Sequence, residues 1–159
     1  MDIRKMIEDE RELDEVLFKK GGIKNYPLNE IILAYKVEVG EALNEWAGFK
    51  FWKTNKRVDR DALLEELADC LHFALSLEGH SSDYSHNYER YEGKKKWKYA
   101  EEYHDIEHYA SWCLRDSEYL GNTIALALSL GFTRKELVEA YYKKNNKNYE
   151  RIVGELING

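Results

Sequence analysis

Two groups of carboxylates have a spacing that could hold divalent cations. Glu38, Glu41 and Glu45 recur three and four residues apart in an apolar helical pattern, which places them on one helix face. Glu66 and Asp69 repeat this spacing further along the chain. Crowded carboxylates repel one another and are costly to bury, whereas one divalent cation satisfies several at once. Because a carboxylate set without cysteine suits Mg²⁺ or Mn²⁺ rather than zinc, we predict four metal ligands, Glu38, Glu41, Glu66 and Asp69; the alternative is two solvated acidic faces.

A basic face near the C-terminus could bind the phosphates that such a metal site implies. Mg²⁺ keeps water molecules and shares its coordination shell with substrate phosphates. Lys144, Asn148 and Arg151 lie at positions i, i+4 and i+7 of one predicted helix, with Asn145 beside them. Arginine binds phosphate through two hydrogen bonds and lysine binds it as a point charge. These four residues are candidate phosphate or sugar ligands; the alternative is a basic helix end that complements the helix dipole.

The elements that position these residues are predicted to be helices. Apolar residues recur every three or four positions, and Pro27 is the only proline. Gly21 and Gly22 end the first segment, and Thr133 with Glu136 forms a capping box before the last one. We predict an all-α bundle of about five main helices, at about 2–19, 28–46, Asp59 or Asp61 to 77, 99–130 with Gly121 as a candidate break, and 133–157.

Length and composition indicate one globular domain over residues 1–159, with 43% apolar and 34% charged residues. Residues of about 79–98 contain no aliphatic side chain, and we expect them to form a mobile surface excursion such as a lid. No stretch approaches 18 apolar residues, so no membrane segment is expected, and the net charge of −6 argues against nucleic-acid binding. Cys70 and Cys113 fall in apolar segments, which predicts reduced, buried thiols in a cytoplasmic protein.

Together these features resemble the dimeric, all-α deoxyuridine triphosphatase (dUTPase) family, within the wider MazG-like pyrophosphatase superfamily. The resemblance covers most of the chain outside about 79–98. It depends on four motifs, namely Glu38-x-x-Glu41 followed by Asn44-Glu45, Phe49-Lys50-Phe51-Trp52, Glu66-x-x-Asp69 leading into Leu71-His72-Phe73, and Tyr141-x-x-Lys144-Asn145-x-x-Asn148-x-x-Arg151. The acidic pairs alone are specific only for the superfamily, whereas the aromatic and C-terminal motifs are specific for the family.

The resemblance implies an activity, a cofactor and a partner. Members of the family bind magnesium through the two acidic pairs and split dUTP into dUMP and pyrophosphate. The expected cofactor is therefore about two or three Mg²⁺ ions, for which Mn²⁺ could substitute. The expected partners are a deoxynucleoside triphosphate as substrate and a second copy of the chain in a homodimer. Glu41, or else Glu38, would orient or deprotonate the attacking water.

The resemblance also implies which residues surround the nucleotide. Lys50 or Lys53 would help the C-terminal basic face to bind phosphate. The base would lie near four side chains, Glu10, Asp14, Trp52 and Phe73. His72 is expected to be a core histidine with a satisfied hydrogen bond rather than a ligand.

At position 10 the chain departs from the family pattern. The family usually places a glutamine in the first helix to bind the edge of uracil, and Glu10 stands there instead. An ionised glutamate only accepts hydrogen bonds, whereas an amide both donates and accepts. Glu10 would repel uracil O4 but could accept a bond from the amino group of cytosine. A pyrophosphatase for dCTP or for a modified nucleotide is therefore an alternative.

Two hypotheses of other classes also fit parts of the sequence. Asp69-x-x-His72 and Glu101-x-x-His104 imitate the Glu-x-x-His element of carboxylate-bridged di-iron bundles. A non-enzymatic helical interaction module would instead use the tyrosine-rich residues 79–98 as its recognition surface.

Overall fold

The computed structural model describes residues 1–81 and 95–158, and all the regular secondary structure of these residues is helical. Its helices are α1 (Ile3–Gly21), α2 (Leu28–Trp46), α3 (Arg60–His80), α5 (Lys95–Tyr103), α6 (Ile106–Arg115), α7 (Tyr119–Ser129) and α8 (Arg134–Asn158). The all-α prediction is thus confirmed, and α2 has the predicted bounds.

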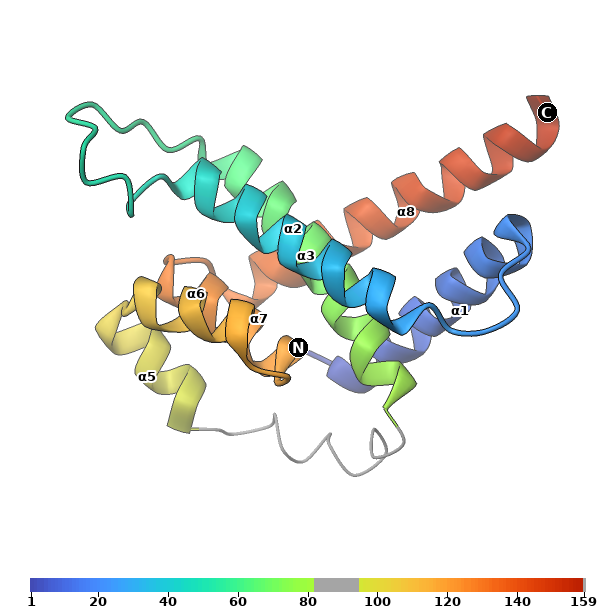
Figure 1. Ribbon diagram of the computed structural model, residues 1–159, viewed down its shortest axis with the longest axis horizontal. Helices are drawn as coiled ribbons and strands as arrows, with labels where there is room; N and C mark the ends of the chain where they lie inside the picture. Colours follow the sequence, from blue (N-terminus) through green and yellow to red (C-terminus); the bar gives the residue numbers. More distant parts are fainter. Residues whose placement is uncertain (82–94, 159) are drawn as a thin grey trace.

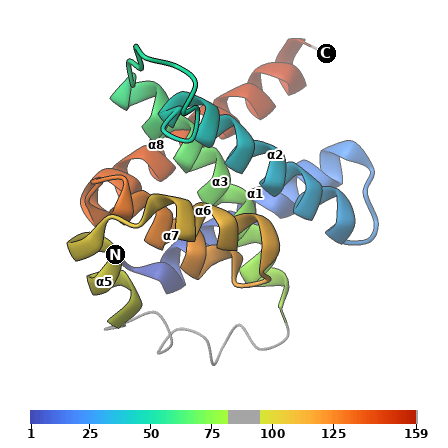
Figure 2. The same cartoon turned by 60° about the vertical axis from the view of Figure 1, so that its left-hand side comes forward.

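Helix α3 lies at the centre of the bundle and contacts α1, α2, α7 and α8 (Figure 1). Its residues Leu67, Leu71 and Leu75 follow one another at four-residue intervals and are almost fully buried. Helix α2 packs along α3 as the second arm of a hairpin. Helix α1 lies on one side of this hairpin and α5, α6 and α7 lie on the other, whereas α8 begins beside α7 and crosses α3 (Figures 1 and 2). Residues on α3 can therefore meet residues from both ends of the chain.

Several helices begin and end at the capping residues that the sequence indicates. Gly22 follows α1 with a left-handed φ of 66°, which favours glycine, and its N–H bonds back to Lys19. Asp59 caps α3, because its carboxylate accepts hydrogen bonds of 3.0 Å from the N–H groups of Asp61 and Ala62. Between α2 and α3, residues 47–59 form a loop that projects from the hairpin (Figures 1 and 2).

The predicted helix over 99–130 is wrong, since the structure has three helices there. The breaks fall at residues 104–105 and 116–118, and His104 takes a left-handed φ of 51° before Asp105 caps α6. Gly121, the candidate break, lies inside α7 and is buried. Apolar spacing alone did not reveal the breaks because the buried positions stay nearly in phase across them.

Residues at both ends of the segment 79–98, which we expected to form a surface excursion, are helical. Gly79 and His80 complete α3, and α5 begins at Lys95. Trp97 is buried, and its Nε1–H donates a 3.2 Å hydrogen bond to the carbonyl oxygen of Gly121. This part of the expected surface segment therefore belongs to the core, and residues 82–94 lie outside the described residues.

Replacing Thr133 with alanine should destabilise the protein by about 1 kcal/mol, because it removes a helix cap. Thr133 Oγ1 accepts a bond of 3.1 Å from the N–H of Glu136, and Glu136 Oε2 accepts one of 2.7 Å from the N–H of Thr133. Urea denaturation measures the free energy of unfolding. The control is Thr54→Ala, in the exposed 47–59 loop; equal effects of the two substitutions would contradict the prediction.

Candidate functional site

A pocket of about 320 Å³ lies between α1, α2, α3 and α8. It brings together residues that the sequence analysis assigned to three roles. Its lining includes Glu38 and Asp69 from the predicted metal site, Lys144, Asn148 and Arg151 from the predicted phosphate face, and Glu10, Asp14 and Phe73 from the predicted base site. The four helices contribute residues far apart in sequence, so only the packing around α3 unites them.

Three of the predicted metal ligands converge, and two of them, Glu38 and Asp69, line this pocket. Glu38, Glu66 and Asp69 each offer a carboxylate oxygen, and the three oxygens lie within 4.8 Å of one another. Burial, helped by the charges of Asp69 and Glu41, raises the pKa of Glu38 to about 7. Burial and the charges of Glu41 and Asp69 also raise the pKa of Glu66. The cluster resists full ionisation by itself, and a divalent cation would relieve that cost.

Glu41 and Glu45 lie beside this cluster rather than in it. Glu41 is exposed and is not among the three residues whose oxygens converge. Its charge nevertheless raises the pKa values of Glu38 and Glu66, and the charge of Glu45 also raises that of Glu66. Glu41 therefore lies near enough to act on whatever the cluster binds, and its role as a ligand stays a prediction.

Lys144 joins the acidic cluster to the basic side of the pocket. Its Nζ lies 2.7 Å from Oδ1 and 2.8 Å from Oδ2 of Asp69. Asn148 and Arg151, one and two turns further along α8, also line the pocket. Asn145 does not line it, since this side chain is buried and its Nδ2 donates a 3.4 Å bond to the hydroxyl of Tyr141. The packing thus separates Asn145 from its three predicted companions.

The loop residues predicted to assist do not line the pocket in this chain. Lys50, Trp52 and Lys53 belong to the 47–59 loop, which projects away from α1 (Figure 1). Trp52 is 61% exposed, and Lys50 lies over the ring of Phe49 at 5.5 Å. Motif order along the sequence could not reveal the direction in which this loop extends, because a loop has no fixed periodicity.

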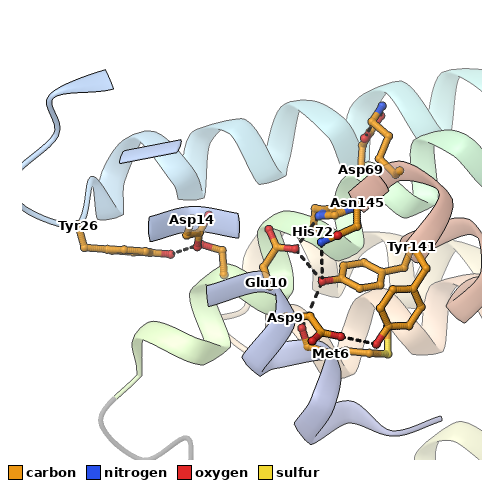
Figure 3. Close-up of polar contacts among 12 residues, drawn as sticks. Met6, Asp9, Glu10, Asp14, Tyr26, Asp69, His72, Tyr141 and Asn145 are labelled. Atoms are coloured by element: carbon orange, nitrogen blue, oxygen red, sulfur yellow. Dashed lines mark hydrogen bonds and ion pairs between the residues drawn. The ribbon is translucent and has the colours of Figure 1, made fainter. Parts of the chain in front are cut away.

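Glu10 is held in a buried hydrogen-bond network at the pocket wall (Figure 3). Its Oε2 accepts a bond of 2.6 Å from His72 Nδ1 and one of 3.0 Å from the hydroxyl of Tyr141. His72 is thus a buried histidine bonded through Nδ1, as predicted, although its Nε2 has no partner in the described part of the chain. Sequence reasoning gave Tyr141 no role at Glu10; its place in the C-terminal motif was the available signal.

Asp14, which lies on α1 like Glu10, belongs to a second chain of hydrogen bonds. Ser76 Oγ donates a 2.6 Å hydrogen bond to Asp14 Oδ2, and the hydroxyl of Tyr26 lies 2.7 Å from Ser76 Oγ. Burial, with a further contribution from the charge of Glu10, raises the pKa of Asp14 to about 7 despite the bond from Ser76. The sequence analysis did not identify Ser76 or Tyr26, because no spacing rule links them to Asp14.

The raised pKa of Asp14 predicts a pH-dependent stability. The folded state retains a proton on Asp14 between the ordinary pKa of 3.8 and about 7, whereas the unfolded state has released it. The contribution of Asp14 to stability is therefore complete below the ordinary value and is lost as the pH rises to about 7. Asp14→Asn should flatten the decline in melting temperature over this window. Glu15→Gln, an exposed neighbour, is the control; parallel curves for wild type and Asp14→Asn would disprove the assignment.

The two elements of the di-iron hypothesis have other partners. Asp69 pairs with Lys144, and His72 bonds to Glu10. Glu101 pairs with Arg134 at 3.3 Å, and His104 Nδ1 lies 2.8 Å from the carbonyl oxygen of Ser129. Glu101 and His104 are also outside the carboxylate cluster. The structure therefore gives the di-iron hypothesis no support among the described residues.

A family model described as dUTPase matches residues 2–155, nearly the whole chain. No curated protein matches the chain significantly. Among the described residues, no helix is both long and apolar enough to cross a membrane.

Proposed function

Because the chain belongs to the all-α dUTPase family and is therefore a nucleotide diphosphatase, we propose that it is a magnesium-dependent pyrophosphohydrolase that converts dUTP to dUMP and pyrophosphate. The observation that carries this proposal is a pocket lined both by Glu38 and Asp69 of the carboxylate cluster and by the basic side of α8. Family membership also rules against the hypothesis of a non-enzymatic interaction module.

The carboxylate cluster fits a magnesium site. Oε2 of Glu38 is buried and has no hydrogen-bond partner among the described residues, which is costly for a carboxylate unless a cation binds it. Glu38, Glu66 and Asp69 would hold the metal, with Glu41 at the edge of the site. Bound Mg²⁺, as about two or three ions or with Mn²⁺ in its place, would neutralise phosphate charge and lower the pKa of a bound water.

The protein side chains would supply proton transfer and orientation. Glu41 is exposed beside Glu38 and would accept the proton of the attacking water; Glu38 is the alternative base. Lys144 and Arg151 would stabilise the negative charge that develops on the departing phosphates, and Asn148 would donate to a phosphate or sugar oxygen. The apolar wall that includes Leu13 would pack against the base.

We also propose that the enzyme is a cytoplasmic homodimer. On α2, Leu33 and Val37 are 65% and 52% exposed and lie one turn apart, which would suit burial against a second copy. Both cysteines, Cys70 and Cys113, are buried as thiols rather than joined in a disulfide, which suits a reducing compartment. Light scattering of the purified protein measures the mass in solution, and a monomer at micromolar concentration would contradict the dimer.

The direct test is pyrophosphate release from dUTP with and without Mg²⁺. We expect turnover with Mg²⁺, with dUMP as the second product, and loss of turnover in excess EDTA that added Mg²⁺ restores. Orthophosphate in place of pyrophosphate would show cleavage at another linkage and contradict the proposal. Turnover unchanged by EDTA would contradict the metal site.

A further inference from the structure

The carboxylate of Glu10 presents one unoccupied oxygen to the pocket. Glu10 is only 4% exposed, and both of its hydrogen bonds, from His72 and Tyr141, reach Oε2. Oε1 has no hydrogen-bond partner among the described residues, yet it is not sealed from solvent, and Glu10 lines the pocket. Figure 3 shows the other oxygen held between the two donors. A buried acceptor is thus fixed in place and aimed at whatever fills this end of the pocket.

The surrounding donors cannot easily satisfy this oxygen. His72 Nδ1 and the Tyr141 hydroxyl are already used at Oε2, and Ser76 donates to Asp14. The remaining side-chain donors of the pocket wall are Lys144, which already pairs with Asp69, and Asn148 and Arg151; the proposed function assigns all three to phosphate or sugar. The ligand must therefore supply the donor, because a buried acceptor left unpaired costs binding free energy.

The two pyrimidine bases differ in what they offer to a carboxylate. Uracil has one N–H donor, N3–H, between two carbonyl oxygens that a carboxylate repels. Cytosine carries an exocyclic amino group with two N–H donors at one corner of its edge. A carboxylate is an acceptor only, so it gains from the amino group without the repulsion.

We propose that Glu10 is a specificity-determining residue that binds an exocyclic amino group, so that this enzyme hydrolyses dCTP at least as efficiently as dUTP. This inference rests on the proposed function, namely pyrophosphohydrolysis in this pocket. It adds an amino-bearing pyrimidine to the substrates. His72 and Tyr141 act as positioning residues, because they hold Oε2 and so turn Oε1 toward the base.

The test compares kcat/KM for dCTP and dUTP, measured by pyrophosphate release with Mg²⁺, in wild type and in Glu10→Gln. The glutamine amide oxygen can still accept from His72 and Tyr141, while its NH₂ group replaces Oε1 and changes an acceptor into a donor. We expect Glu10→Gln to lower the dCTP/dUTP ratio of kcat/KM by at least about tenfold. Glu12→Gln, an exposed carboxylate of the same helix, should leave the ratio unchanged.

The ratio of the kcat/KM values for dCTP and dUTP is insensitive to a partly unfolded preparation, because both values fall together. Thermal unfolding of both variants adds a check on the fold. A wild-type kcat/KM for dCTP lower than that for dUTP would overturn the inference, and so would a ratio that Glu10→Gln leaves unchanged. Hydrolysis of dUTP alone would leave the proposed function intact, whereas no pyrophosphate from either nucleotide would reject both.

Discussion

Glu66→Gln should lower kcat/KM for pyrophosphate release by at least about a hundredfold, while the protein stays folded. Glu66 supplies one of the three convergent oxygens, and its half-buried carboxylate faces the negative charges of Glu41 and Asp69. The substitution keeps the side-chain size but removes the charge that a divalent cation needs. The Mg²⁺ concentration for half-maximal activity should rise with the loss in rate, and steady-state assays over a range of Mg²⁺ concentrations measure both.

The adjacent residue provides a matched control for this variant. Glu65 lies on the same helix but is exposed, and it pairs with Lys147 at 3.5 Å. Exposed ion pairs contribute little to stability, so Glu65→Gln should fold normally. Because Glu65 is not among the three convergent carboxylates, the variant should have nearly wild-type activity and Mg²⁺ dependence. Near-normal turnover in Glu66→Gln, or an equal loss in Glu65→Gln, would refute the assignment of the metal site.

Lys144→Ala should also reduce kcat/KM by about a hundredfold, but for a different reason from Glu66→Gln. Lys144 holds both oxygens of Asp69, and its charge opposes the rise in the pKa of Glu66. Without it, the departing phosphates lose a positive charge, whereas the carboxylate cluster becomes more negative and should still attract Mg²⁺. The Mg²⁺ concentration for half-maximal activity should therefore not rise, in contrast to Glu66→Gln.

Lys147→Ala controls for removal of a lysine from the same helix. Lys147 lies one turn further along α8 and pairs with the exposed Glu65 rather than with the metal cluster. It should have nearly wild-type kinetics. If Lys144→Ala raised the Mg²⁺ requirement as much as Glu66→Gln does, Lys144 would be supporting the metal site rather than the phosphates.

Much of the fold was predictable because it depends on short-range geometry. A helix repeats every 3.6 residues, so the apolar spacing and the caps were sufficient to predict α2 and the start of α8. The breaks within 99–130 were not predictable in this way, because they depend on how α5, α6 and α7 pack against one another and the core. Trp97 shows the same limit, since its buried bond to Gly121 joins two segments that no local pattern connects.

For the site, the sequence by itself determined the ligand types and their spacing within each helix. Glu66 and Asp69 share a face of α3 wherever that helix packs, because three residues make nearly one turn. Only the tertiary structure decided that Glu38 meets them, that the 47–59 loop does not line this pocket, and that Asn145 is buried away from it. It also decided that Oε1 of Glu10 has no hydrogen-bond partner within residues 1–81 and 95–158. Such outcomes depend on which helix faces meet, and that is set by packing around α3 rather than by spacing along one chain segment.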